Sequence, residues 1–126
     1  MPTVDLWPDF KIDPKPRGIR QMLEEAGEGL KPKTKDLVEF RAWPADGRSP
    51  EFPFRFRCEL YVRTLDYHYP LFEVYSSATG FPAQVRTGGS TTPVVTEAEL
   101  FSALGEVFQA AETRAVIQNL ISMATE

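Results

Sequence analysis

Residues 54–64 alternate between apolar and polar side chains more regularly than any other stretch of this chain. Successive side chains of a β-strand point to opposite faces, so the alternation predicts a strand with one buried face and one outward face. No helical register would gather these residues on one side. The apolar set is Phe54, Phe56, Cys58, Leu60 and Val62, and the polar set is Arg55, Arg57, Glu59, Tyr61 and Arg63.

Three further segments, residues 37–43, 70–76 and 81–87, have the composition of strands. The connections carry turn sequences at residues 46–47, 66–68 and 78–80, and they are too short for the crossovers that parallel strands need. We therefore expect an antiparallel sheet. Pro82 lies within the fourth segment, which favours a place for that strand at the sheet edge.

Apolar residues with helical spacing occur both before and after these strands in the sequence. Apolar residues recur at helical intervals over residues 16–26, and again after Thr96, which with Glu99 has the spacing of a capping box. The second apolar pattern changes phase near Glu112 and Thr113, which predicts a break and a further helix.

Together these patterns predict an α+β fold: a four-stranded antiparallel β-meander with helices packed on one face, in the order αββββαα. Eight of the eleven prolines lie at or before Pro53, and residues 1–15 hold several of them beside Trp7 and Phe10. We expect residues 1–15 to form a Pro-rich N-terminal arm and residues 16–126 to form a single α+β domain.

Composition excludes several classes of protein. The 42% hydrophobic and 25% charged residues are typical of globular chains. One cysteine and one histidine exclude a disulfide framework and the multi-cysteine zinc sites. The first residues lack the basic start and apolar core of a secretory signal, and no apolar run is long enough for a membrane span. We expect a cytoplasmic protein without a bound metal or organic cofactor.

Three features invite a catalytic or ligand-binding interpretation. His68 beside Asp66 is the only pair that resembles acid–base machinery, although an aromatic surface turn explains it as well. Cys58 lies on the apolar face of its strand, as a buried structural thiol does. Residues 87–92 are rich in glycine but lack the lysine of a phosphate-binding loop, which favours a flexible connection into the Thr96 cap. None of these three features forms a complete catalytic site, so the sequence predicts no catalytic residue.

The outward face of the sheet is the candidate binding surface. Arginine and tyrosine are enriched at protein–protein hot spots, and the strand alternation directs side chains of both types to this face. The alternative is that its arginines and glutamates pair with one another across strands and only stabilise the sheet. The predicted partner-binding residues are Arg41, Arg55, Arg57, Tyr61, Arg63, Tyr75 and Arg86.

No stretch of the sequence carries a motif that resembles a known family. We expect a small non-enzymatic binding or regulatory module of the inhibitor, immunity-protein or adaptor kind, whose partner is another protein or a second copy of the chain. One alternative is a nucleic-acid or phosphorylated-ligand binder that uses the same arginines and tyrosines. The net charge of −4 disfavours it. The other alternative is a small enzyme centred on Asp66 and His68. We expect no association with membranes.

Overall fold

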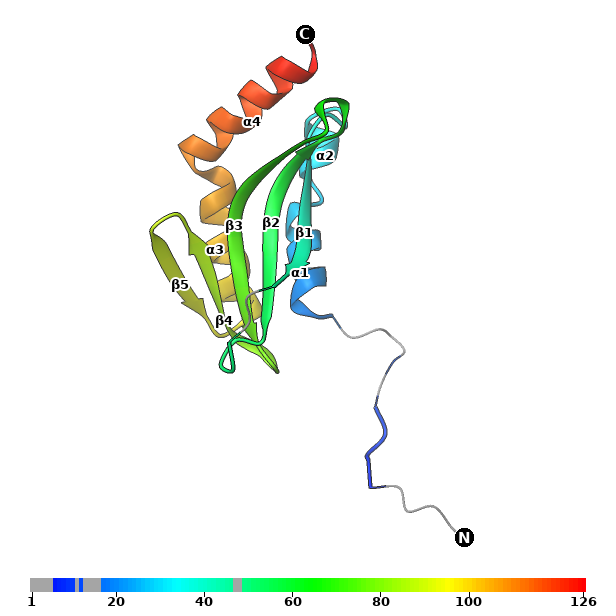
Figure 1. The fold of residues 1–126 in the computed structure, drawn as a ribbon, viewed down its shortest axis with the longest axis vertical. Helices are drawn as coiled ribbons and strands as arrows, with labels where there is room; N and C mark the ends of the chain where they lie inside the picture. The colour runs from blue at the N-terminus through cyan, green and yellow to red at the C-terminus, as the bar shows by residue number, and fades with distance from the viewer. Residues whose placement is uncertain (1–5, 11, 13–16, 47–48) are drawn as a thin grey trace.

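The strand that the alternation predicts lies near the middle of the sheet in a computed structural model of the chain (Figure 1), which describes residues 6–10, 12, 17–46 and 49–126. Two helices precede the sheet and two come after it. The elements are α1 (Ile19–Gly27), α2 (Leu30–Lys33), β1 (Glu39–Ala45), β2 (Phe54–Val62), the 3-10 turn η1 (Arg63–Leu65), β3 (Tyr67–Ser77), β4 (Gly80–Thr87), β5 (Ser90–Val94), α3 (Glu97–Gln109) and α4 (Ala111–Ala124).

The five strands form one antiparallel meander in the order β1-β2-β3-β4-β5. Helices α1 and α3 lie behind the sheet in the view of Figure 1, and α4 continues from α3 toward the upper end of the sheet. Leu120 of α4 packs with the buried Val38, Leu60 and Val62, so all three helices contribute to the same face. We call this the inner face and the opposite one the outer face. The helices bury the apolar side of the strands, and no helix of the described chain covers the other side.

The core lies between the inner face and the helices. Leu23 of α1 and Leu100 of α3 are fully buried against the sheet, and Phe40, Phe72 and Phe108 form an aromatic cluster with centroid separations of 5.3–6.1 Å. A second, smaller cluster joins α4 to the other end of the strands. Its buried members are Val38, Leu60, Val62 and Leu120.

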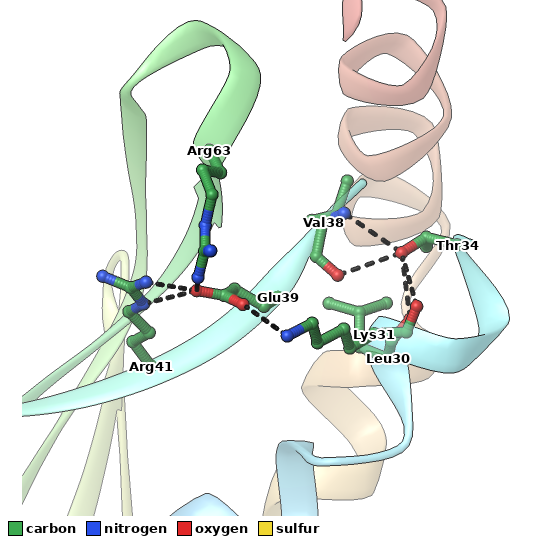
Figure 2. A network of polar contacts seen from close by, with 7 residues as sticks. All are labelled: Leu30, Lys31, Thr34, Val38, Glu39, Arg41 and Arg63. Atoms are coloured by element: carbon green, nitrogen blue, oxygen red, sulfur yellow. Dashed lines mark hydrogen bonds and ion pairs between the residues drawn. The ribbon is translucent and has the colours of Figure 1, made fainter. Parts of the chain in front are cut away.

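Two close contacts hold α1 and the end of α2 against β1 and the residue that precedes it. Gly27, the last residue of α1, lies so near the Phe40 ring that an added Cβ would overlap it. The buried Thr34 hydroxyl accepts a hydrogen bond from the Val38 amide at 3.1 Å, and it lies 3.0 Å from the Val38 carbonyl oxygen (Figure 2). The first contact sets how closely α1 approaches the sheet, and the second joins the end of α2 to the next strand.

The sheet has five strands, so the four predicted from the sequence are one too few. Residues 87–92, interpreted from the sequence as a flexible connection, form the β4–β5 hairpin, with Gly88 at a positive φ of 38° in its turn. The predicted order αββββαα also omits α2. A short edge strand of serine, threonine and proline has no apolar alternation, so its composition resembles that of a loop.

The fifth strand also overturns the edge position predicted for Pro82, because β4 pairs with both β3 and β5. Pro82 is tolerated for another reason. The β4–β5 register begins at Ala83, and the β3–β4 register shifts between Ser76 and Ser77, so Pro82 lies at an irregularity where no ladder bond is required of it.

The helical predictions need smaller corrections. Thr96 caps α3 by accepting a hydrogen bond from the Glu99 amide, which confirms the predicted cap. The Glu99 carboxylate accepts a hydrogen bond from the Val95 amide, one residue before the Thr96 amide that a capping box would use. The break after α3 falls at Ala110, two residues before the predicted one. Among the described residues, no helix is long and apolar enough to cross a membrane.

The predicted arm, residues 1–15, is described only at residues 6–10 and 12, and the other nine lie outside the described residues. Leu6, Phe10 and Ile12 are exposed. At its root, Arg17 forms ion pairs with Glu25 of α1 and with Glu97 of α3. The division of the chain at residue 15 stays a prediction.

A matched pair of glycine substitutions tests the contact between α1 and the sheet. In Gly27→Ala the new methyl group overlaps Phe40, and we expect a loss of about 1–3 kcal/mol in the free energy of unfolding. In Gly105→Ala, within α3, a Cβ meets nothing within 4 Å, and the helix should gain about 0.5–1 kcal/mol. Chemical denaturation of both variants measures the two shifts, and equal shifts of the same sign would contradict the contact.

Thr34 provides a second pair. Thr34→Val keeps the shape but leaves the buried Val38 amide without its acceptor, for an expected loss of about 1–3 kcal/mol. Thr34→Ser keeps the hydroxyl and should lose clearly less. Amide hydrogen exchange at Val38 checks the cause, because protection should fall in the valine variant and persist in the serine variant.

Candidate functional site

The outer face is where the predicted binding residues gather. Six of the seven lie on strands, and the cross-strand register brings them into adjoining rows: Arg55 opposes Tyr75, and Tyr75 opposes Gln84. Arg63 is the exception, because β2 ends at Val62 and Arg63 begins η1. Even so, its guanidinium reaches the same face, 4.0 Å from the carboxylate of Glu39.

Arg55, Glu73 and Tyr75 form one polar cluster on this face. Arg55 forms an ion pair with the Glu73 carboxylate and donates to the Asp46 carbonyl oxygen, and the Tyr75 hydroxyl donates to Glu73 at 3.2 Å. The hydrogen bond from Arg55 is the main cause of a lowered pKa at Glu73, with the charge of Arg57 adding to it. Glu73 is therefore held as a carboxylate whose acceptor positions are in use.

Glu39 is the centre of a second cluster (Figure 2). Its carboxylate accepts from the Nε of Arg41 at 2.7 Å, and the Nζ of Lys31 lies 3.7 Å away. Burial alone would raise the pKa of Glu39, but the hydrogen bond from Arg41 and the charges of Arg41, Lys31 and Arg63 outweigh it, so the pKa is lowered. One carboxylate thus lies within 4.0 Å of three cations, more positive charge than it can neutralise.

The two outer tyrosines are covered by guanidinium groups. The Cζ of Arg41 lies 3.9 Å from the centroid of the Tyr61 ring, and that of Arg86 lies 4.1 Å from the Tyr75 ring. Such contacts are favourable cation–π interactions. Each occupies a ring face that a nucleic-acid base would otherwise need for stacking.

Arg57 and Arg86 differ from the other three arginines of the outer face in having no ion-pair partner in the described part of the chain. Among the described residues neither forms an ion pair, and both are exposed. Both oppose Glu73 across the strands, one from each side, but Glu73 is already bound by Arg55 and Tyr75. Beside Arg57 in the same row lies Trp43, whose side chain is 40% exposed.

His68 lies on the outer face with a partner that the sequence does not suggest. Its Nδ1 is 2.7 Å from the Glu59 carboxylate, and Glu59 is buried. Asp66, the predicted partner of His68, instead accepts a hydrogen bond from the Tyr61 hydroxyl at 3.2 Å. The structure therefore separates the Asp66–His68 pair on which the enzyme alternative depends.

A bulge explains the new pairing. The β2–β3 register shifts between Cys58, which opposes Phe72, and Glu59, which opposes Pro70, so Leu71 is left without a partner. The extra residue allows Leu71 and Phe72 both to pack toward the helices. It also brings Glu59 under the first residues of β3, where His68 meets its carboxylate.

The other two candidate features are structural in the described part of the chain. Cys58 is fully buried, and burial raises the pKa of its thiol, so the interpretation as an inert core cysteine is confirmed. Gly88 and Gly89 belong to the β4–β5 turn and precede a strand rather than a helix. Among the described residues, no group of three or more His, Cys, Asp or Glu side chains is arranged to hold a metal ion.

Two members of the outer face are missing from the residues predicted from the sequence. Trp43 ends the first predicted strand, residues 37–43, in which Arg41 faces outward, so the two-residue spacing from Arg41 could have placed it there. Lys31 lies in α2, which the sequence does not predict, and nothing in the pattern indicates its approach to Glu39.

The Glu73 cluster predicts how stability depends on pH. The pKa of Glu73 lies below its ordinary value of 4.5 in the folded protein, so its stabilising contribution is complete above that value and is lost as the pH falls through the folded-state pKa. Glu73→Gln should lower the free energy of unfolding by about 1 kcal/mol at pH 7 and flatten its decline below pH 4.5.

The matched control is Glu112→Gln on α4, which removes the same charge from an exposed helical position. Urea unfolding between about pH 2.5 and 7 compares the two variants across the range in which carboxylates titrate. An equal effect in both would show that net charge, and not the cluster around Glu73, sets the acid sensitivity.

Comparison of the chain with protein-family models, with curated protein sequences and with solved structures finds no match. A function for the chain is therefore inferred from the geometry and charge of its outer face.

Proposed function

We propose that the protein is a non-enzymatic binding module that holds another protein against the outer face of its sheet. The observation that carries the proposal is an open β-sheet face, without a covering helix in the described chain, on which Trp43 and Arg57 are exposed side by side. Tryptophan and arginine are among the residue types most enriched at protein–protein hot spots.

The pairing within the face supports a rigid surface. Arg41 and Arg55 are held by ion pairs, so a partner would meet these two side chains in positions that are already fixed. A preorganised surface loses less side-chain entropy on binding than a flexible one. The same ion pairs also serve the structural alternative, because they stabilise the sheet without any partner. That alternative accounts for the 5.7 Å contact between the Arg41 guanidinium and the Trp43 ring, but it does not account for the unpaired Arg57 or for the exposure of Trp43.

The nucleic-acid alternative has weaker support. The covered rings of Tyr61 and Tyr75 are poor stacking platforms, and three carboxylates are interleaved with the arginines of the face. A protein partner uses the same residues through hydrogen bonds and apolar contact, for which free tyrosine ring faces are not needed.

Site-specific photo-crosslinking tests the proposal. A photoreactive phenylalanine analogue replaces Trp43 on the outer face, and in a matched protein it replaces Gln118, an exposed residue of α4. After irradiation in the cells of origin, we expect one adduct of defined mass from position 43 that survives nuclease and is absent from position 118.

Mass spectrometry of the adduct separates the remaining outcomes. A nuclease-sensitive adduct would favour the nucleic-acid alternative and overturn the proposal. Equal labelling from both positions, or none from position 43, would contradict a binding role for the outer face. An adduct between two copies of the chain would keep the face as an interface and make the partner a second copy.

A further inference from the structure

The two unpaired arginines of the outer face border a shallow hollow in the sheet. The hollow has a volume of about 330 Å³, and Arg57, Pro70, Glu73, Tyr75, Arg86 and Gly88 contribute to its lining. Pro70 belongs to the lining and opposes Glu59, because the bulge at Leu71 shifts the register of β3 there. The hollow is thus a product of the fold at the bulge, with one guanidinium on each side.

The spacing of the two guanidinium groups follows from the sheet. Arg57 lies on β2 and Arg86 on β4, with Glu73 of β3 between them in the same row. Two strand separations place their Cα atoms about 10 Å apart. Both side chains are long enough to meet one anionic group, or two neighbouring ones, over the hollow.

The charge in the hollow is not balanced from within. Glu73 would be the natural partner of both arginines, but its carboxylate is bound by Arg55 and by the Tyr75 hydroxyl. Arg86 is held in place by the Tyr75 ring and by a 3.3 Å hydrogen bond to the Gln84 side-chain oxygen, neither of which neutralises it. The side chain of Arg57 has no hydrogen-bond partner among the described residues. The only carboxylate that lines the hollow, Glu73, is thus paired with Arg55, and neither Arg57 nor Arg86 forms an ion pair with it among the described residues.

We infer that this hollow is an oxyanion-binding site for the carboxylate side chains of an acidic segment of the protein partner. Guanidinium groups form short, charge-assisted and often bidentate hydrogen bonds with carboxylates. The nearby Glu73 disfavours a phosphate dianion more than it disfavours a single carboxylate, because repulsion grows with the charge of the ligand. Trp43, next to Arg57 in the row, offers an apolar contact beside the acidic group.

This inference rests on the proposed function, because it names the chemistry of the partner that the outer face binds. It also adds a requirement that the proposed function lacks. Binding must depend on Arg57 and Arg86 specifically, and it must weaken with added salt, as contacts between exposed charges do.

The test uses the full chain labelled with ¹⁵N and follows the Nε–Hε signals of its arginines by NMR. The probes are a capped hexaglutamate peptide and inorganic phosphate, each titrated at the same ionic strength. We expect saturable shifts of the Arg57 and Arg86 signals with the peptide, and weaker binding with phosphate.

Three variants each remove one positive charge. Arg57→Gln and Arg86→Gln should each weaken hexaglutamate binding about tenfold, the cost of one charge-assisted hydrogen bond. Arg114→Gln on the exposed side of α4 is the matched control and should leave the affinity unchanged. Unchanged backbone amide spectra of β3 and β4 confirm that the variants remain folded.

Equal weakening in Arg114→Gln would show general charge attraction and overturn the inference. Phosphate that binds as tightly as the peptide would overturn the carboxylate assignment, and the absence of saturable shifts would overturn the site itself. Failure here with a persistent crosslink from position 43 would remove only the acidic-segment inference. Peptide binding without any crosslink would instead count against the proposed function.

Discussion

The helices of this protein cover only one face of its sheet, and much of the remaining structure follows from that asymmetry. Five paired strands leave a broad outer surface that must be stable in water without a second layer. The sequence meets this requirement with long side chains that cover the strands and bind one another. The guanidinium groups of Arg41 and Arg86 lie over tyrosine rings and cover them. Tyr61 and Tyr75 are half-buried as a result, although no helix of the described chain packs on them.

The sequence predicts those parts of the fold that depend on local alternation and spacing. The strand around Cys58, the Thr96 cap and the antiparallel pairing follow from patterns a few residues long, and the structure bears them out. The sequence predicts β5 and the bulge at Leu71 poorly for a shared reason. Residues 90–94 become an edge strand because their backbone pairs with the free backbone groups of β4. A bulge arises where one strand has one more residue than the strand that it pairs with. Neither depends on side-chain periodicity.

In the candidate site, too, the local pattern predicts some features and tertiary contacts decide the others. Alternation places the arginines on one face, but it cannot say which of them pair. Arg57 and Arg55 are equivalent in the pattern, yet Arg55 holds Glu73 and Arg57 does not, since the diagonal approach from Arg55 is favoured by the Asp46 carbonyl oxygen beyond the end of the strand. The suggested pairing of His68 with Asp66 is wrong for a related reason. Its partner Glu59 is nine residues away and is brought to it by the bulge, whereas the neighbouring Asp66 adopts a left-handed conformation that ends η1 and turns toward Tyr61.

The distribution of charge favours a distinct protein as the partner over a second copy. The chain is acidic overall, yet the outer face carries five arginines with three glutamates, and residues 96–126 carry one arginine with five glutamates. Attraction between copies would therefore join the outer face of one to the helical side of the next. When two different surfaces of the same chain form an interface, each copy still has one of the two surfaces free for a further copy. Assembly then continues until it closes into a ring, or it extends into a filament. A two-fold dimer whose axis passed through the hollow would instead place the unpaired Arg57 and Arg86 near their own copies, and like charges would oppose it. A separate chain with an acidic segment satisfies both arginines without either consequence.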